Sequence, residues 1–180
     1  MSSLQKFHRR TQSVAIANPF TVKGTGNDTL GYWLGTAIDN TSKLIVAPKA
    51  TQVTNLSWGS YGTFRGTISI TDGLANTNTL YTFGSAAHPA AYYCKTLATG
   101  GYNTWYMPST HELRIIYSNR TTPFTTNNDM NHANGDYFLS STEINFNTAD
   151  SRRMTIGFST FGLPKNRGNG NYGLRAIRKL

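Results

Sequence analysis

The sequence has almost no cysteine, few charged residues and no long hydrophobic run. Cys94 is the only cysteine among 180 residues, which excludes an intramolecular disulfide and a zinc site built on paired cysteines. No apolar run reaches the length that a membrane-spanning helix needs. The N-terminal residues "MSSLQKFHRRTQ" lack the apolar segment and cleavage site of a secretory signal. We therefore expect core packing, hydrogen bonding or assembly to stabilise the fold.

Charged residues make up 14% of the chain, where about 25% is typical of soluble domains. Acidic residues are missing from residues 151–180, so that segment carries +7, while residues 1–29 carry +3 and the segment between them sums to −1. This asymmetry indicates either an acidic partner, such as a nucleic acid or an acidic protein, or a solvated surface with a basic bias.

In place of charged residues the chain has 26 Thr, 17 Asn, 14 Ser and 17 Gly. Threonine favours strands, whereas asparagine and glycine favour turns. Aromatic residues at 12% exclude a disordered composition. The length and composition predict one turn-rich, strand-rich domain with a real core.

Residues 1–29 show no sustained hydrophobic period and contain the turn sequences "NPF" and "KGTGND". We interpret them as an extended basic arm in front of a domain that covers residues 30–180. The arm residues expected to contact another chain are basic or aromatic, namely Lys6, Phe7, Arg9, Arg10 and Phe20.

Several segments have strand character. "YWLGTAID" and "KLIVAP" flank a turn at residues 40–42 and predict a hairpin. "FRGTISIT" places Phe64, Ile68 and Ile70 on one face of a predicted strand, and "TDGLANTNT" after it carries turn signals. The later segments "YFLSST", "RMTIGFST" and "YGLRAIRKL" are also predicted to be strands.

Two helices are predicted, over residues 88–98 and 109–119. In the first, Pro89 suits the opening turn, and the glycines at 100 and 101 are expected to terminate it. Cys94 lies on the apolar stripe of that helix, so we interpret it as a buried small hydrophobe. The stripe has helical spacing and consists of Ala90, Tyr93, Cys94 and Leu97.

The segment "GGYNTWYMPSTHEL" (residues 100–113, here called the aromatic block) leads into the second helix. Ser109 and Glu112 have capping-box spacing, in which the serine hydroxyl and the glutamate carboxylate each accept a backbone N–H from the other residue. His111 and Glu112 also begin a metalloprotease helix motif, but Ile115 stands where the second histidine is needed. The block is therefore predicted to be a folding signal.

No converging set of catalytic groups is visible in the sequence. Histidines at positions 8, 88, 111 and 132 lack ligand spacing, and Cys94 lacks an oriented base. Trp105 and Tyr102 could stack on a sugar, but their place beside the capping box favours packing. We therefore predict a protein that is not an enzyme and has neither cofactor nor metal.

Three motifs together resemble the Lcl C-terminal-domain-like family: the aromatic block, "FLSSTE" at residues 138–143, and "YGLRAIR" at residues 172–178. The resemblance covers roughly residues 30–178. It implies an α+β, C-type-lectin-like fold, with two helices packed on a twisted antiparallel sheet. The calcium signatures Glu-Pro-Asn and Trp-Asn-Asp are absent, as is the cysteine pair of the formylglycine-generating relatives.

Members of that family occur in bacterial adhesins and in virion proteins of tailed phages. The resemblance therefore implies a structural virion protein, made in the host cytoplasm, that displays the domain for host attachment and docks through residues 1–29. A head decoration protein without receptor binding is the alternative, and a nucleic-acid-binding protein is a remote one. The expected partners are other virion proteins, further copies of the chain and a host glycan or protein, without membrane insertion.

In lectin-like folds ligands are bound by loops in the second half of the domain. The resemblance therefore predicts ligand-binding loops at residues 119–136, Asn145–Arg153 and Lys165–Tyr172. Amides and guanidinium groups suit hydroxyl-rich or anionic polymers. The candidate ligand-binding residues in these segments are Asn145, Asn147, Arg152, Arg153, Asn166, Arg167, Asn171 and Tyr172.

Overall fold

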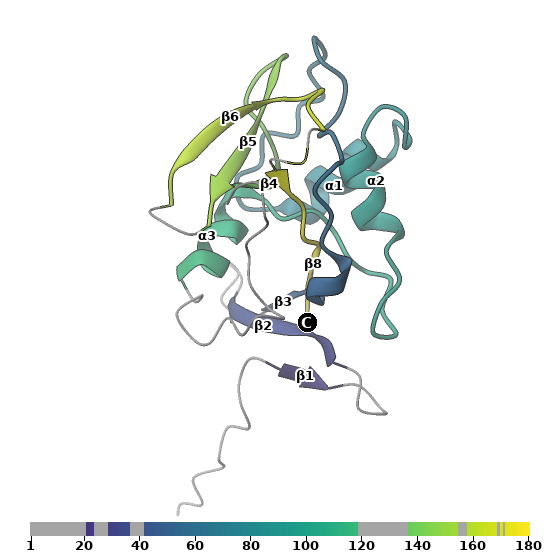
Figure 1. Ribbon diagram of the computed structural model, residues 1–180, viewed down its shortest axis with the longest axis vertical. Coiled ribbons are helices and arrows are strands. Elements are labelled where there is room, and N and C mark those ends of the chain that lie inside the picture. Colours follow the sequence, from purple (N-terminus) through teal and green to yellow (C-terminus); the bar gives the residue numbers. More distant parts are fainter. Residues whose placement is uncertain are drawn as a thin grey trace, which may run out of the picture.

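The computed structural model describes residues 21–23, 29–36, 42–118, 137–154, 158–168, 170 and 172–180. These residues form a mixed α+β fold with three α-helices and two curled sheets (Figure 1). In chain order the elements are β1 (Thr21–Lys23), β2 (Thr29–Thr36), β3 (Lys43–Val46), η1 (Lys49–Thr51), α1 (Gly73–Tyr81), α2 (Pro89–Thr96), α3 (Thr110–Ser118), β4 (Tyr137–Glu143), β5 (Thr148–Arg153), β6 (Thr160–Pro164), β7 (Tyr172–Gly173) and β8 (Ile177–Lys179).

The first sheet has the order β1-β2-β3-β8 and is antiparallel throughout. The predicted pairing of the hairpin strands is confirmed, since β2 and β3 are antiparallel with Thr36 opposite Lys43, while residues 40 and 41 of the predicted turn lie outside the described residues. β8 then pairs with β3, with Ile45 opposite Arg178, so the two ends of the domain meet in one sheet. The arm residues Lys6, Phe7, Arg9, Arg10 and Phe20 lie outside the described residues, whereas Thr21–Lys23 of the predicted arm form β1 and pair with β2.

The second sheet has the order β6-β5-β4-β7, and its β4–β7 pair is parallel. "YFLSST" is confirmed as the strand β4, which is buried along almost its whole length. The predicted strand "RMTIGFST" is wrong at its described positions, because β5 ends at Arg153, β6 begins at Thr160, and Met154, Phe158 and Ser159 belong to neither strand; residues 155–157 lie outside the described residues. The single C-terminal strand is also wrong, because β7 and β8 belong to different sheets and residues 174–176 pass between them.

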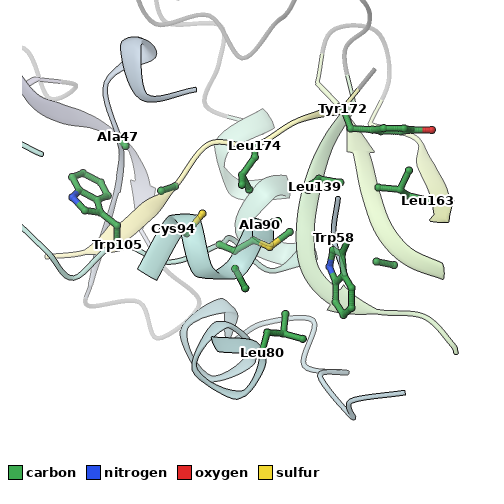
Figure 2. Packing of buried hydrophobic residues seen from close by; sticks show 14 of the residues in the cluster. Ala47, Trp58, Leu80, Ala90, Cys94, Trp105, Leu139, Leu163, Tyr172 and Leu174 are labelled. Carbon is green, nitrogen blue, oxygen red and sulfur yellow. The ribbon is translucent and has the colours of Figure 1, made fainter. Parts of the chain in front are cut away.

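Two hydrophobic clusters fill the space between these layers. The larger cluster joins α1, α2, the aromatic block and one face of the second sheet, and it contains Trp58, Leu80, Cys94 and Trp105 (Figure 2). The smaller one lies between α3 and the two sheets, with Phe138 among its residues. Within the described part of the chain, no helix is long and apolar enough to cross a membrane.

α2 confirms the first predicted helix but ends earlier than expected. Pro89 occupies its first turn, and Ala90 and Cys94 are fully buried as predicted. Leu97 is already extended, so the helix stops before the two glycines. Those glycines have positive φ angles of 61° and 78° and form a separate tight turn closed by Thr99 and Tyr102.

α3 confirms the second predicted helix and its capping box. The Ser109 backbone N–H donates to Glu112 Oε2 at 2.8 Å, and the Glu112 backbone N–H donates to Ser109 Oγ at 3.3 Å. Glu112 accepts two further hydrogen bonds, from the Tyr106 hydroxyl (2.8 Å) and from the Gly73 backbone N–H (3.2 Å). Its side chain therefore joins the starts of α1 and α3, and burial raises its pKa above the ordinary value.

α1 was not expected, because its sequence "GLANTNTLY" has turn residues and weak apolar periodicity. Asp72 caps the helix by accepting from the Ala75 backbone N–H at 3.0 Å. The buried face is largely polar, and its groups find partners outside the helix: the Asn76 amide donates to the Ser69 carbonyl at 2.7 Å. These tertiary hydrogen bonds stabilise a helix that hydrophobic periodicity does not signal.

The predicted strand at "FRGTISIT" is wrong. Residues 64–70 form an irregular loop, and Phe64, Ile68 and Ile70 are 42%, 62% and 56% exposed. Gly66 has a φ of 74°, which takes the chain out of the extended conformation. The backbone groups of the loop form separate hydrogen bonds with residues of other elements. The Thr67 carbonyl, for example, accepts from the Glu143 backbone N–H at 2.8 Å.

Two arginines of "YGLRAIR" are internal. Arg175 is 1% exposed and its Nε donates to the Ala47 carbonyl at 2.7 Å. Arg178 is 2% exposed, and its guanidinium lies 3.6 Å from the centre of the Tyr102 ring. Much of the basic charge predicted for the surface of residues 151–180 therefore lies inside the domain.

Candidate functional site

The turn between β4 and β5 meets the turn after β6 at one end of the second sheet. Asn145 shapes the first turn, because its side-chain oxygen accepts two backbone N–H groups, at 2.8 and 2.9 Å. The carbonyl of Asn147 accepts from the Lys165 backbone N–H at 3.0 Å, and the exposed Asn166 and Arg167 follow directly. We call Asn145, Asn147, Asn166 and Arg167 the turn group.

A buried ion pair lies beneath the turn group. Lys165 Nζ donates to Glu143 Oε1, and both side chains are completely buried. Lys165 Nζ also donates to the Thr63 carbonyl at 2.6 Å, while Glu143 accepts the backbone N–H groups of Arg65 and Gly66, each at 2.8 Å from Oε2. A buried pair is tolerated when its remaining hydrogen-bonding groups are satisfied in this way. The pair therefore holds Lys165, the residue before Asn166 and Arg167 of the turn group, against residues 63–66.

His88 extends this network beneath the loop. Arg65 Nε donates to His88 Nε2 at 3.2 Å, so Nε2 must accept, and Nδ1 lies 3.4 Å from the Trp58 carbonyl and must carry the proton. Burial, and then the positive charge of Arg65, lower the pKa of His88. The imidazole is therefore neutral around pH 7 and positions the loop through Arg65, whose guanidinium also covers the Phe83 ring at 3.9 Å.

Arg152 and Arg153 lie at the opposite end of β5. The expectation that residues 145–153 form one loop is wrong, because only 145–147 form the turn and the rest is β5. Arg152 forms an ion pair with Asp150 at 2.9 Å and also donates to the Thr160 hydroxyl. Arg153 is half-buried and faces the Tyr137 ring, with 6.0 Å between guanidinium carbon and ring centre. Both arginines have structural contacts within the sheet.

Tyr172 is also part of the packed sheet. It is only 7% exposed and pairs with Tyr137 across β7 and β4, with ring centres 6.3 Å apart. Phe161 covers the same ring of Tyr137 at 5.4 Å. The expectation that Tyr172 projects from an exposed loop is therefore wrong.

The eight candidate residues do not form one site. β5 separates the turn group from Arg152 and Arg153, and its rise of roughly 3.3 Å per residue puts them about 17 Å apart. Asn171 and residues 119–136 lie outside the described residues. Among the described candidates, the exposed and convergent ones are those of the turn group.

An exposed apolar surface adjoins the turn group. Phe64 of the loop and Phe146 of the turn have ring centres 5.5 Å apart. Exposed apolar patches of this kind often mark interaction sites. Sequence reasoning missed this surface, because alternation had assigned Phe64 to one face of a predicted strand. The surface consists of Phe64 and Phe146, which are 42% and 61% exposed.

Neither an ionised cysteine nor a cluster of metal ligands is found among the described residues. Cys94 is fully buried, as predicted, and burial raises its pKa far above the ordinary value, which keeps the thiol protonated. Among the residues that the structure describes, no group of three or more His, Cys, Asp or Glu side chains could hold a metal ion.

Comparison with protein-family models found no family that matches this chain, and comparison with curated proteins found no matching relative.

Proposed function

We propose that this chain is a non-enzymatic structural protein of a tailed-phage virion, which displays a C-type-lectin-like domain for attachment to the host surface. Residues 1–29 dock the domain on the particle, and a hydroxyl-rich or anionic surface polymer contacts the turn group. The family resemblance of the three sequence motifs is the starting point for this proposal.

The observation that carries the binding part is the rigid display of the turn group. Asn147, Asn166 and Arg167 are exposed, and the backbone bond from Lys165 to Asn147 holds their two turns together. The buried Glu143–Lys165 pair lies directly beneath. Polar groups that are presented on a fixed base lose little entropy on binding, and a guanidinium binds anionic groups through charge-assisted hydrogen bonds.

The three motifs that carry the resemblance act as a framework for this display. The aromatic block bonds to "YGLRAIR" through two backbone hydrogen bonds between Tyr106 and Ile177, at 2.8 and 2.9 Å. It bonds to "FLSSTE" through the Thr110 backbone N–H, which donates to the Thr142 hydroxyl at 3.2 Å. A framework built from the motifs, with exposed turns projecting from it, agrees with a binding module on a fixed scaffold.

Burial of basic side chains counts against the nucleic-acid reading. Lys165, Arg175 and Arg178 together would supply nearly half of the charge of residues 151–180, yet each is at most 2% exposed. Phosphate backbones are bound by exposed lysine and arginine. The C-terminal segment therefore does not present a basic stripe.

The test is a double substitution, Asn147→Ala with Arg167→Ala, in particles that carry the chain. Both changes leave the backbone bonds of the turns in place, so the free energy of unfolding should change by less than about 0.5 kcal/mol. Loss of a charge-assisted hydrogen bond to the ligand should slow adsorption to host cells about tenfold or more. Arg114→Ala, at an exposed arginine of α3, is the matched control and should adsorb normally.

The outcomes separate the alternatives. Normal adsorption by the double variant, with normal incorporation into particles, contradicts attachment through the turn group. Normal adsorption together with reduced physical stability of particles that lack the protein favours the decoration role. Absence of the protein from purified particles contradicts the virion assignment itself.

A further inference from the structure

His88 is a fully buried histidine whose ring is fixed in place. At the start of α2 its backbone N–H donates to the Gly84 carbonyl and its carbonyl accepts from the Tyr92 N–H, each at 3.0 Å. The ring packs edge to face against Trp58, with ring centres 5.3 Å apart. The backbone at Gly59 comes so close that a Cβ there would lie 2.1 Å from His88 Nδ1. The imidazole therefore has little room to turn.

Arg65 faces this ring from the loop. Its Nε donates to His88 Nε2 at 3.2 Å, so the hydrogen bond exists only while Nε2 carries no proton. The guanidinium stays charged at any pH at which the protein is folded. A proton on Nε2 would therefore replace the hydrogen bond by a contact between two donors that are both positively charged, and such a contact is repulsive.

The other charges that face His88 do not make up for this repulsion. Burial is the largest cause that lowers the pKa of His88, while the contact with the Trp58 carbonyl raises it. Among the charged groups, Arg65 of the loop and Lys165 after β6 also lower the pKa, and Glu143 of β4 raises it. Glu143 is itself paired with Lys165, so the charge of Arg65 remains the one that an imidazolium would meet.

Arg65 is also the partner that can move. Its side chain is only half-buried, whereas His88 is enclosed on several sides. The loop is held at this point in two ways, by the backbone N–H groups of Arg65 and Gly66, which donate to Glu143 Oε2, and by the Arg65 side chain. Loss of the side-chain contact would leave only the backbone bonds.

We propose that the contact between Arg65 and His88 is an acid-sensitive attachment of residues 63–66 to the domain. At neutral pH the uncharged imidazole accepts from Arg65 and holds the loop. In acid the imidazolium repels the guanidinium, and the loop opens. Because Phe64 of this loop contacts Phe146, acidification would change the exposed apolar surface beside the turn group.

Proton linkage gives the direction and the size of the effect. The pKa of His88 is lowered while the loop is attached, so the open state binds more protons than the attached state. Attachment is therefore complete above the ordinary histidine pKa of about 6.5 and is lost as pH falls from there toward the lowered value. Within that range each pH unit should favour opening by about tenfold.

The test is hydrogen exchange of the Arg65 and Gly66 amides in the full chain, because both donate to Glu143 while the loop is attached. Protection factors, corrected for the intrinsic pH dependence of exchange, are compared at pH 7.5 and pH 5. We expect the protection of both amides to fall by about tenfold or more in acid.

Two substitutions and one control assign the effect to this contact. His88→Gln supplies an acceptor that does not titrate, so its protection should be the same at both pH values. Arg65→Met removes the donor but keeps the backbone amide, so protection should be reduced already at pH 7.5 and change little in acid. His111→Gln is the matched control, since the His111 backbone N–H donates to the Ile70 carbonyl at the end of the same loop, and it should keep the wild-type fall.

Equal protection of the wild type at the two pH values overturns the proposal. A fall of the wild-type size in His88→Gln also overturns it, because another group then titrates. Should His88→Gln fail to fold, Arg65→Met decides, since an undiminished fall without the guanidinium is equally incompatible with the proposal. A parallel fall at the Ile116 amide of α3 overturns it as well, because the whole domain would then open. None of these outcomes depends on the virion role.

Discussion

Substitution of Glu112 tests whether one buried carboxylate holds the starts of α1 and α3 together. Glu112→Ala removes the carboxylate that accepts from three buried donors: the N–H groups of Ser109 and Gly73 and the hydroxyl of Tyr106. Each unsatisfied donor costs roughly 1–3 kcal/mol, and water that enters the vacated space lowers this cost. We expect a loss of about 3–6 kcal/mol, against a total stability of roughly 5–15 kcal/mol for an ordinary domain.

Glu112→Gln is the informative comparison, because the two backbone donors share Oε2 while the Tyr106 hydroxyl bonds to Oε1. A glutamine can keep its oxygen at the Oε2 position, and the Tyr106 hydroxyl can rotate to accept from the amide. The expected loss is about 1 kcal/mol. Urea unfolding followed by circular dichroism gives both values, with an unchanged m-value as the check that the compactness of both states is preserved.

The reasoning fails if the free energy of unfolding of Glu112→Ala lies within about 1 kcal/mol of the wild-type value. The loss of three hydrogen bonds in a buried site should lower that free energy by more than this amount. It also fails if Glu112→Gln is as damaging as Glu112→Ala. The negative charge, rather than the acceptor geometry, would then stabilise this junction.

Three further substitutions test other contacts. Gly73→Ala should lower the free energy of unfolding by about 2 kcal/mol in urea unfolding, since the new Cβ would lie 2.4 Å from a Glu112 oxygen and 2.6 Å from backbone atoms, and a cost near zero would contradict this packing. Lys165→Met should cost about 3–5 kcal/mol because Glu143 is left as a buried unpaired charge, whereas the double change with Glu143→Gln should recover part of that loss. His88 has a lowered pKa, so the folded state binds fewer protons than the unfolded one; its stabilisation is complete above the unfolded pKa of about 6.5 and is lost as pH falls below it. Urea midpoints between pH 8 and 5 should therefore fall less steeply in His88→Gln, and identical slopes would contradict the assignment.

The elements that the sequence predicted correctly have local causes. The pairing of β2 with β3 follows from two apolar segments separated by turn-forming residue types, and the start of α3 follows from the spacing of Ser109 and Glu112. In each case the residues that decide the structure lie within a few positions of one another. Local signals of this kind agree with the final fold, so they can be recognised without knowledge of the tertiary contacts.

The elements that were missed depend on distant partners. The buried face of α1 includes Asn76 and Thr77, whose amide and hydroxyl bond to the Ser69 carbonyl and to the carbonyls of Gly73 and Met107. Polar residues buried this way leave no hydrophobic period. The loop at residues 64–70 shows the converse, since its apolar alternation suggests a buried strand while its side chains are exposed.

The candidate site was predicted only in part for a similar reason. Asn145, Asn147, Asn166 and Arg167 come from two turns that the sequence did mark, and β5 and β6 bring them to one end of the sheet. Arg152 and Tyr172 were also chosen for their residue type, but their side chains make contacts that only the strand register defines. Residue type predicts what a side chain can bind, whereas burial decides whether it is available.

The pairing of β3 with β8 also constrains how the chain acquires its structure. Leu44 lies opposite Lys179 in the β3–β8 pair. β3 can therefore pair with β8 only after a further 135 residues have been synthesised. Contacts of such long sequence separation slow folding, because much of the chain must be ordered before they form. During synthesis β3 would emerge from the ribosome with one side unpaired, and the first sheet could be completed only after β8 had also emerged. The closing of the first sheet is therefore expected to be among the last steps in the folding of this domain.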